Sequence, residues 1–298
     1  MKLSSALKKE FMYFSRTWRL FGVVFAIMIF ALADPIMIKG MGMLMNSFVE
    51  LAEEQSEAAI AAGDEDAVMF TEEDTAALAV FSEMDASGMM AMSIGDFTST
   101  AVLIVLLLMM GPSGSEQKKR SIIIPRCAGL TPNMYVTPKF ILYPLTGFLA
   151  GFLGMFLCAG VTSLMFEGAI DMGMLALGAV SVGLYIAFVM ILELTLGICT
   201  ERPGVSVITV LAATTVIPAL LSSFRIDKFN PFALPSIAQN AFLTDATVMG
   251  VSGNAELDMT NVAVSLIVTV ILSLILYFTT LFVLTARQIE NEGNEAVL

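Results

Sequence analysis

The sequence contains no histidine and little charge of either sign. Without histidine the chain lacks the commonest proton relay and the commonest metal ligand, and a Ser-His-Asp triad is excluded. Only 14% of the 298 residues are charged and 57% are hydrophobic, whereas ordinary soluble domains carry about 25% charged residues. Because the uncharged residues gather in runs long enough to cross a bilayer, a water-soluble fold is excluded.

Cysteine is scarce as well, and the motifs of nucleotide and metal sites are missing. Cys127, Cys158 and Cys199 are far apart and odd in number, so they form no disulfide framework. No phosphate-loop, H-E-x-x-H or C-x-x-C pattern is present. The 22 methionines have no histidine beside them and are interpreted as packing residues rather than copper ligands. We therefore expect a non-enzymatic chain without a cofactor or metal of its own.

Six apolar runs predict an all-α fold, a polytopic membrane protein with a single transmembrane domain over residues 1–298. A helix needs roughly 20 mostly apolar residues to cross a hydrocarbon core about 30 Å thick. The runs that approach this length are residues 20–38, 93–110, 140–165, 172–199, 205–221 and 262–284.

Lysine and arginine are distributed unequally between the segments that join these runs. Because basic residues are retained in the cytoplasm, their distribution predicts the orientation of the spans. If the N-terminus is inside, 12 of the 15 basic residues lie in inner segments, and only Lys39, Arg225 and Lys228 lie outside. Both termini are therefore predicted to be cytoplasmic.

Residues 1–19 are predicted to form an amphipathic helix that lies in the membrane interface. Leu7, Phe11, Phe14 and Trp18 recur at helical spacing and form one apolar face. Two alternatives remain open at this point. The segment is a helical extension of the first span, or it belongs to a signal peptide cleaved after Ala33, which would leave five spans.

Three segments outside the spans are long enough to have structure of their own. Residues 40–92 carry 12 acidic residues and no lysine or arginine, and we expect a largely helical external region with a turn at residues 63–66. This region is either a solvated cap or a surface that attracts cations. Residues 111–139 form the largest cytoplasmic loop, and residues 285–298 form a cytoplasmic tail.

A few residues inside the predicted spans stand out. Glu193 is the one ionisable residue well inside a span, which indicates either a transport path or a structural hydrogen bond near the cytoplasmic interface. Asp34 and Asp96 lie nearer the outer boundary and are predicted to be hydrated. Gly147 and Gly151 form a G-x-x-x-G pattern that permits close helix contact, either inside the chain or between two copies.

The order of these features resembles the membrane subunit of ABC type-2 exporters. The amphipathic helix leads directly into the first span, and residues 229–242 resemble a re-entrant stretch between spans five and six. The most specific likeness lies in the loop 111–139, where an acidic residue and a basic cluster precede an apolar triplet. Its residues are Glu116, Lys118, Lys119, Arg120, Ile122, Ile123, Ile124, Arg126 and Tyr135.

The resemblance implies a division of labour between subunits. The loop would dock on a separate ABC ATPase subunit that holds ATP and Mg²⁺, while this chain forms the translocation path with Glu193 as a candidate residue on it. Two permease copies, identical or related, would assemble with two ATPases in the plasma membrane of a prokaryote. Membrane lipids are expected partners and nucleic acid is not.

Two other functions remain open on the sequence. An ion-gradient-driven secondary transporter often shows inverted repeats and mid-membrane charges, but no convincing repeat is present and Glu193 is nearly alone. A non-transporting sensor or scaffold would use the acidic region 40–92 to bind a ligand. The sequence does not indicate a substrate.

Overall fold

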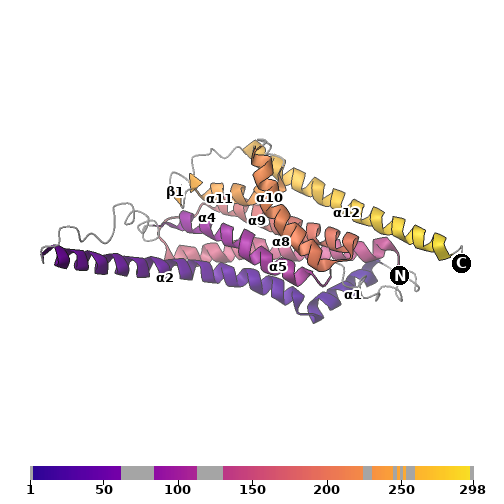
Figure 1. Cartoon of the computed structure of the whole chain (residues 1–298), viewed down its shortest axis with the longest axis horizontal. Coiled ribbons are helices and arrows are strands. Elements are labelled where there is room, and N and C mark those ends of the chain that lie inside the picture. The colour runs from indigo at the N-terminus through magenta and orange to yellow at the C-terminus, as the bar shows by residue number, and fades with distance from the viewer. Residues whose placement is uncertain are drawn as a thin grey trace.

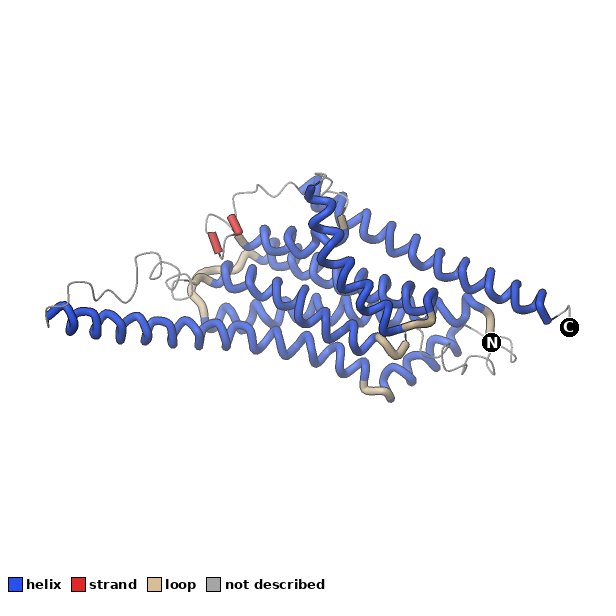
Figure 2. Tube along the Cα trace, viewed as in Figure 1, coloured by secondary structure: helices blue, strands red, loops and turns tan. Residues whose placement is uncertain are grey.

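The computed structural model describes residues 3–61, 84–112, 130–223, 230–243, 247–248, 251–252 and 259–295. This part of the chain is helical except for one antiparallel hairpin of two-residue strands, which lies on the side away from the two termini (Figure 2). Six helices among the described residues are long and apolar enough to cross a membrane. The prediction of an all-α chain with six helices of spanning length is therefore confirmed.

The helices run lengthwise along the molecule (Figure 1). The second predicted span is built from three consecutive pieces, α4, η1 and α5, of which η1 is a π-helical turn. The elements are α1 (Leu3–Arg16), α2 (Arg19–Ala61), α4 (Ala86–Asp96), η1 (Phe97–Ala101), α5 (Val102–Met109), α8 (Pro132–Met165), α9 (Met172–Thr200), α10 (Pro203–Ser223), η3 (Pro231–Ala233), α11 (Leu234–Phe242), β1 (Thr247–Val248), β2 (Val251–Ser252) and α12 (Met259–Glu295).

Helix α9 lies at the centre of the bundle and packs most closely against α8. The glycines of the G-x-x-x-G pattern make this approach possible. A Cβ atom on Gly151 would lie 2.8 Å from Ile186 Cδ1 and 3.1 Å from the Cα atom of Gly183 on α9. One turn further along α8, a Cβ on Gly154 would lie 2.7 Å from Ile27 of α2. The small-residue stripe is therefore a packing seam inside the chain.

Helices α10 and α12 lie at the periphery and expose apolar side chains. Only 17% of the most apolar window of α10 is buried, and 11% of that of α12, against 67% for α9. Apolar residues on the outside of a spanning helix are expected to face lipid or another subunit. The large exposed apolar side chains of α12 are Met259, Ile267, Val270, Ile271, Leu274, Ile275, Phe278 and Phe282.

Several helices are longer than the predicted spans. The first continues to Ala61 as one helix, because residues 39–61 contain good helix formers and no proline; the predicted turn at residues 63–66 lies outside the described residues. Helix α4 begins at Ala86, where the side chain of Asp85 accepts a hydrogen bond from Gly88 N at 2.7 Å. Helix α12 extends into the predicted tail as far as Glu295.

The predicted loop between spans two and three is shorter than expected at its C-terminal end. Helix α8 begins at Pro132, with Thr131 as its N-cap, so residues 132–139 are its first two turns. Between spans five and six, η3 and α11 fold back against α9 and α4. Leu234 and Ala238 of α11 are fully buried.

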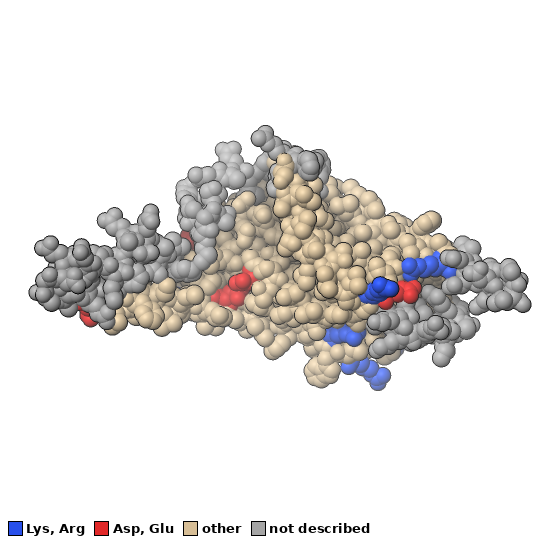
Figure 3. Space-filling model, in the orientation of Figure 1, with Lys and Arg blue, Asp and Glu red and all other residues tan. Residues whose placement is uncertain are grey.

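Both termini lie at the same end of the bundle (Figure 1). Most of the described lysine and arginine side chains gather at this end (Figure 3), which is called the basic end below. Trp18 makes the bend between α1 and α2 in a left-handed conformation, with φ of 59°. The basic residues of this end are Lys8, Lys9, Arg16, Arg19, Lys139, Arg202 and Arg287.

Candidate functional site

Most of the predicted coupling residues lie outside the described part of the chain. These are Glu116, Lys118, Lys119, Arg120, Ile122, Ile123, Ile124 and Arg126. Tyr135 is described, and it is a buried residue in the first turn of α8, with 8% of its surface exposed. Its ring lies 4.9 Å from Lys139 Nζ, at a cation–π distance. Tyr135 therefore belongs to the packed base of α8 and not to an open loop.

A buried cluster joins α1 to α8 at the basic end. Lys139 is fully buried and its Nζ atom donates to Glu10 Oε1 at 3.0 Å. The hydroxyl of Tyr143, one turn further along α8, donates to the same oxygen at 2.7 Å. These three residues are called the Glu10 cluster. A buried charge pair with a further hydrogen bond holds two helices in one register, because separating them would leave charges in an apolar environment.

Helix α1 packs on α8 through a different face from the one predicted. Ala6, Glu10 and Phe14 are its buried residues, and the ring of Phe14 meets that of Tyr143 edge-on, with centroids 4.4 Å apart. Phe11 is 48% exposed and Trp18 is 75% exposed. The predicted apolar face therefore splits, with Phe14 in the bundle and the other two aromatic rings on the outside.

The Glu10 cluster was missed by sequence reasoning, and only weak signals could have revealed it. Glu10 is the only acidic residue in an otherwise basic helix, and Lys139 and Tyr143 are four residues apart, on one face of α8. Glu10 and Lys139 are separated by 129 positions, so no local pattern pairs them.

Glu193 is also buried, between α9 and α10. Its side chain is fully shielded, and Glu193 Oε1 accepts a hydrogen bond from Ser206 Oγ at 2.8 Å. Ser206 Oγ lies 2.8 Å from the Pro203 carbonyl oxygen as well. The contact lies near the basic end, since α9 ends at Thr200. Glu193 and the Glu10 cluster thus belong to different helix pairs.

A second link at the basic end ties α12 to the end of α9. Arg287 donates to Glu201 Oε1 at 2.9 Å and to the Cys199 carbonyl oxygen at 2.6 Å. Glu201 adopts a left-handed conformation with φ of 59° and ends the helix. A cation bonded to the last carbonyls of a helix is favourable there.

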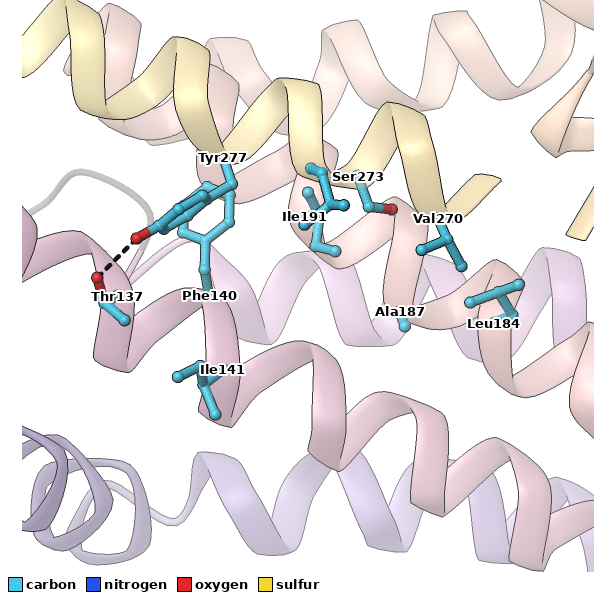
Figure 4. A pocket seen from close by; sticks show the side chains of 10 residues that line it. Thr137, Phe140, Ile141, Leu184, Ala187, Ile191, Val270, Ser273 and Tyr277 are labelled. Carbon is cyan, nitrogen blue, oxygen red and sulfur yellow. Dashed lines mark hydrogen bonds between the residues drawn. The ribbon is translucent and has the colours of Figure 1, made fainter. Parts of the chain in front are cut away.

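An apolar groove runs between α8, α9 and α12 (Figure 4). It has a volume of about 390 Å³, and a second groove of about 430 Å³ continues from it, sharing Leu184 and Val270. Its end nearest the basic end is polar, because Thr137 Oγ1 and Tyr277 Oη form a hydrogen bond of 2.9 Å there. Among the described residues, no charged side chain lines either groove. The lining suits a hydrocarbon chain better than an ion.

The predicted hydration of Asp34 is wrong. Asp34 is only 6% exposed, and the helix that carries it packs against α4 and α8. Asp96 is half-buried and ends α4 directly before the π-helical turn η1. These two residues are called the Asp34 pair. Among the described residues, no group of three or more acidic, cysteine or histidine side chains could hold a metal ion.

Comparison of the chain with family models, with curated proteins and with solved structures finds no match.

Proposed function

We propose that this chain is the permease subunit of an ATP-driven exporter of the ABC type-2 kind, and that the loop predicted over residues 111–139 couples it to a separate ATPase. The observation that carries the proposal is the Glu10 cluster. The C-terminal part of this coupling segment, residues 132–139, forms the first two turns of α8, which are joined to α1 by a fully buried lysine. A displacement of the segment would therefore move α1 and α8 together.

The chain needs an external energy source if it transports uphill, because its sequence has no phosphate loop. ATP and Mg²⁺ belong to the partner ATPase in this proposal. The segment combines the apolar Ile122–Ile124 with a basic cluster. Burial of the apolar triplet would supply affinity, and the basic residues would steer an acidic cleft and fix its register.

The membrane orientation forms part of the proposal. The basic end is cytoplasmic, and α1 lies in the cytoplasmic interface with the exposed rings of Phe11 and Trp18 toward lipid. Cysteines placed at Ser56 and Ser113, in a chain whose native cysteines are replaced, should label oppositely with an impermeant thiol reagent. Labelling of Ser113→Cys from outside the cell would overturn the orientation.

The coupling role is tested with Ile123→Asp in the assembled complex. The substitution places an unpaired charge in the contact, at a cost of several kcal/mol if the site is buried. We expect loss of co-purification with the ATPase and loss of permease-stimulated ATP turnover, whereas the matched control Ile123→Leu keeps both. If Ile123→Asp leaves both unchanged in a folded, membrane-inserted protein, this segment is not the coupling element.

A second candidate function is a carrier driven by an ion gradient. It is favoured by the Asp34 pair, because carriers of this class bind their coupling ion with groups inside the membrane. Transport by the purified chain in vesicles, driven by an imposed Na⁺ or proton gradient without any ATPase, would favour the carrier. Transport that requires both ATP and the ATPase would favour the permease.

A further inference from the structure

Asp34 is buried, and its position along α2 places it at the depth of the hydrocarbon core and not at the boundary of the membrane. Asp34 comes 15 residues after Arg19 on the same helix, which corresponds to about 22 Å along the axis. A hydrocarbon core is about 30 Å thick, so a helix that enters the membrane near Arg19 carries Asp34 within that core. Helix α2, which carries Asp34, packs against both α4, which ends at Asp96, and the turn η1 that follows, and the two carboxyl groups lie within electrostatic range of each other.

No described group neutralises the Asp34 pair. Asp34 Oδ2 is buried and has no hydrogen-bond partner among the described residues. Among the described residues, Lys139 forms a salt bridge with Glu10 and Arg287 forms one with Glu201, and no lysine or arginine forms one with Asp34 or Asp96. An isolated carboxylate in an apolar environment is costly, so a positive charge that enters the site would be strongly favoured.

Two hydroxyl groups lie next to Cys158, which is itself a neighbour of Asp34. Cys158 is within electrostatic reach of Asp34, and its thiol donates to Ser93 Oγ at 3.4 Å, with Thr162 Oγ1 at 4.0 Å. Directly after Asp96 the chain forms the turn η1, and turns of this π-helical kind occur frequently at functional sites. Carboxylate and hydroxyl oxygens are the ligands that hard cations prefer.

We propose that Asp34 and Asp96 bind a monovalent cation, with Na⁺ as the test ion, between α2 and the α4–η1 junction. A divalent ion fits less well, because Ca²⁺ takes six to eight oxygen ligands and no described group of three metal-ligating side chains exists. Figure 3 shows acidic atoms at the surface of an otherwise uncharged belt, where Figure 1 places α2 beside α4.

Thermal unfolding of the purified full-length chain in detergent tests the site. NaCl is titrated against choline chloride at constant ionic strength. An ion that binds only the folded state raises Tm with its concentration. We expect a saturating rise with Na⁺ that is absent in Asp34→Asn and shifted to at least tenfold higher Na⁺ in Asp96→Asn. Glu50→Gln is the matched control, because Glu50 is an exposed acid on the same helix, and it should keep the full rise.

Three results would overturn the proposal. These are an equal rise with choline, a rise with Na⁺ that persists in Asp34→Asn, and, in parallel series with CaCl₂ and with falling pH, a rise produced only by Ca²⁺ or only by acidification. The last of these would mean that the pair holds a divalent ion or a proton. No ATPase is present in this experiment, so its failure leaves the proposed permease function standing, and failure of the coupling test leaves the cation site standing.

Discussion

Two buried carboxylates in this bundle have opposite surroundings. Glu10 receives a salt bridge from Lys139 and a hydrogen bond from Tyr143, at 3.0 and 2.7 Å. Asp34, on the next helix, is equally shielded but has a second carboxyl group nearby and a buried oxygen without a hydrogen-bond partner. Burial costs both groups the solvation of their charge, yet only the first has a compensating charge among the described residues.

The difference separates a structural carboxylate from a binding one. A carboxylate whose interactions are satisfied gains nothing from a ligand, and its removal leaves its partner charged and buried. A carboxylate without a partner is destabilising in the free protein, and a ligand can relieve that cost. Glu10 therefore serves the α1–α8 contact, whereas Asp34 is available to bind.

The largest expected effect comes from removal of the lysine that forms a salt bridge with Glu10. Lys139→Met leaves Glu10 buried without its cation, and we expect unfolding in detergent to become easier by about 3–5 kcal/mol. The measurement is the midpoint of thermal or denaturant unfolding. Lys8→Met removes an exposed lysine from α1 and should stay within about 0.5 kcal/mol of the native chain.

The double substitution Glu10→Leu with Lys139→Met sharpens that result. Replacement of a whole buried ion pair by apolar residues is often neutral or stabilising, so we expect most of the stability lost in Lys139→Met to return. If the double variant is no more stable than Lys139→Met alone, the effect of Lys139 comes from packing and not from its charge pair with Glu10.

Glu193 is the intermediate case. Its carboxylate accepts a hydrogen bond from the hydroxyl of Ser206, and Glu193→Gln keeps an acceptor oxygen while it removes the charge. Since hydrogen bonds to charged groups contribute about 1.5–3 kcal/mol and neutral ones about 1 kcal/mol, we expect unfolding to become easier by about 1 kcal/mol. If Glu193 lies on the transport path, the transport rate of the folded complex should fall even after correction for the fraction of protein that unfolds. A normal transport rate would mean that Glu193 has only a structural role.

The spans could be predicted from sequence because the bilayer imposes a simple rule of length and apolarity, which residues 140–165 and 172–199 satisfy. The packing of Gly151 against α9 could be predicted only as one of two alternatives. The Glu10 cluster could not be predicted, since Glu10 and Lys139 come together only when α1 folds onto α8. The burial of Asp34 depends likewise on helices distant in sequence.

The smallest expected effect concerns Asp34, the carboxylate without a described hydrogen-bond partner at its buried oxygen. In Na⁺-free choline buffer, Asp34→Asn should leave the midpoint of thermal unfolding unchanged or raise it slightly. An asparagine has nearly the same shape, and a neutral amide costs less to bury than a carboxylate. The substitution removes no described salt bridge, and the buried oxygen Oδ2 of Asp34 has no hydrogen-bond partner among the described residues. The same carboxylate-to-amide change at Glu10, Glu10→Gln, should lower the midpoint, because it leaves Lys139 buried and charged. The net contribution of a typical hydrogen bond is about 1 kcal/mol. If Asp34→Asn lowers the free energy of unfolding by more than this, Asp34 stabilises the fold as Glu10 does, and the distinction between the two carboxylates fails.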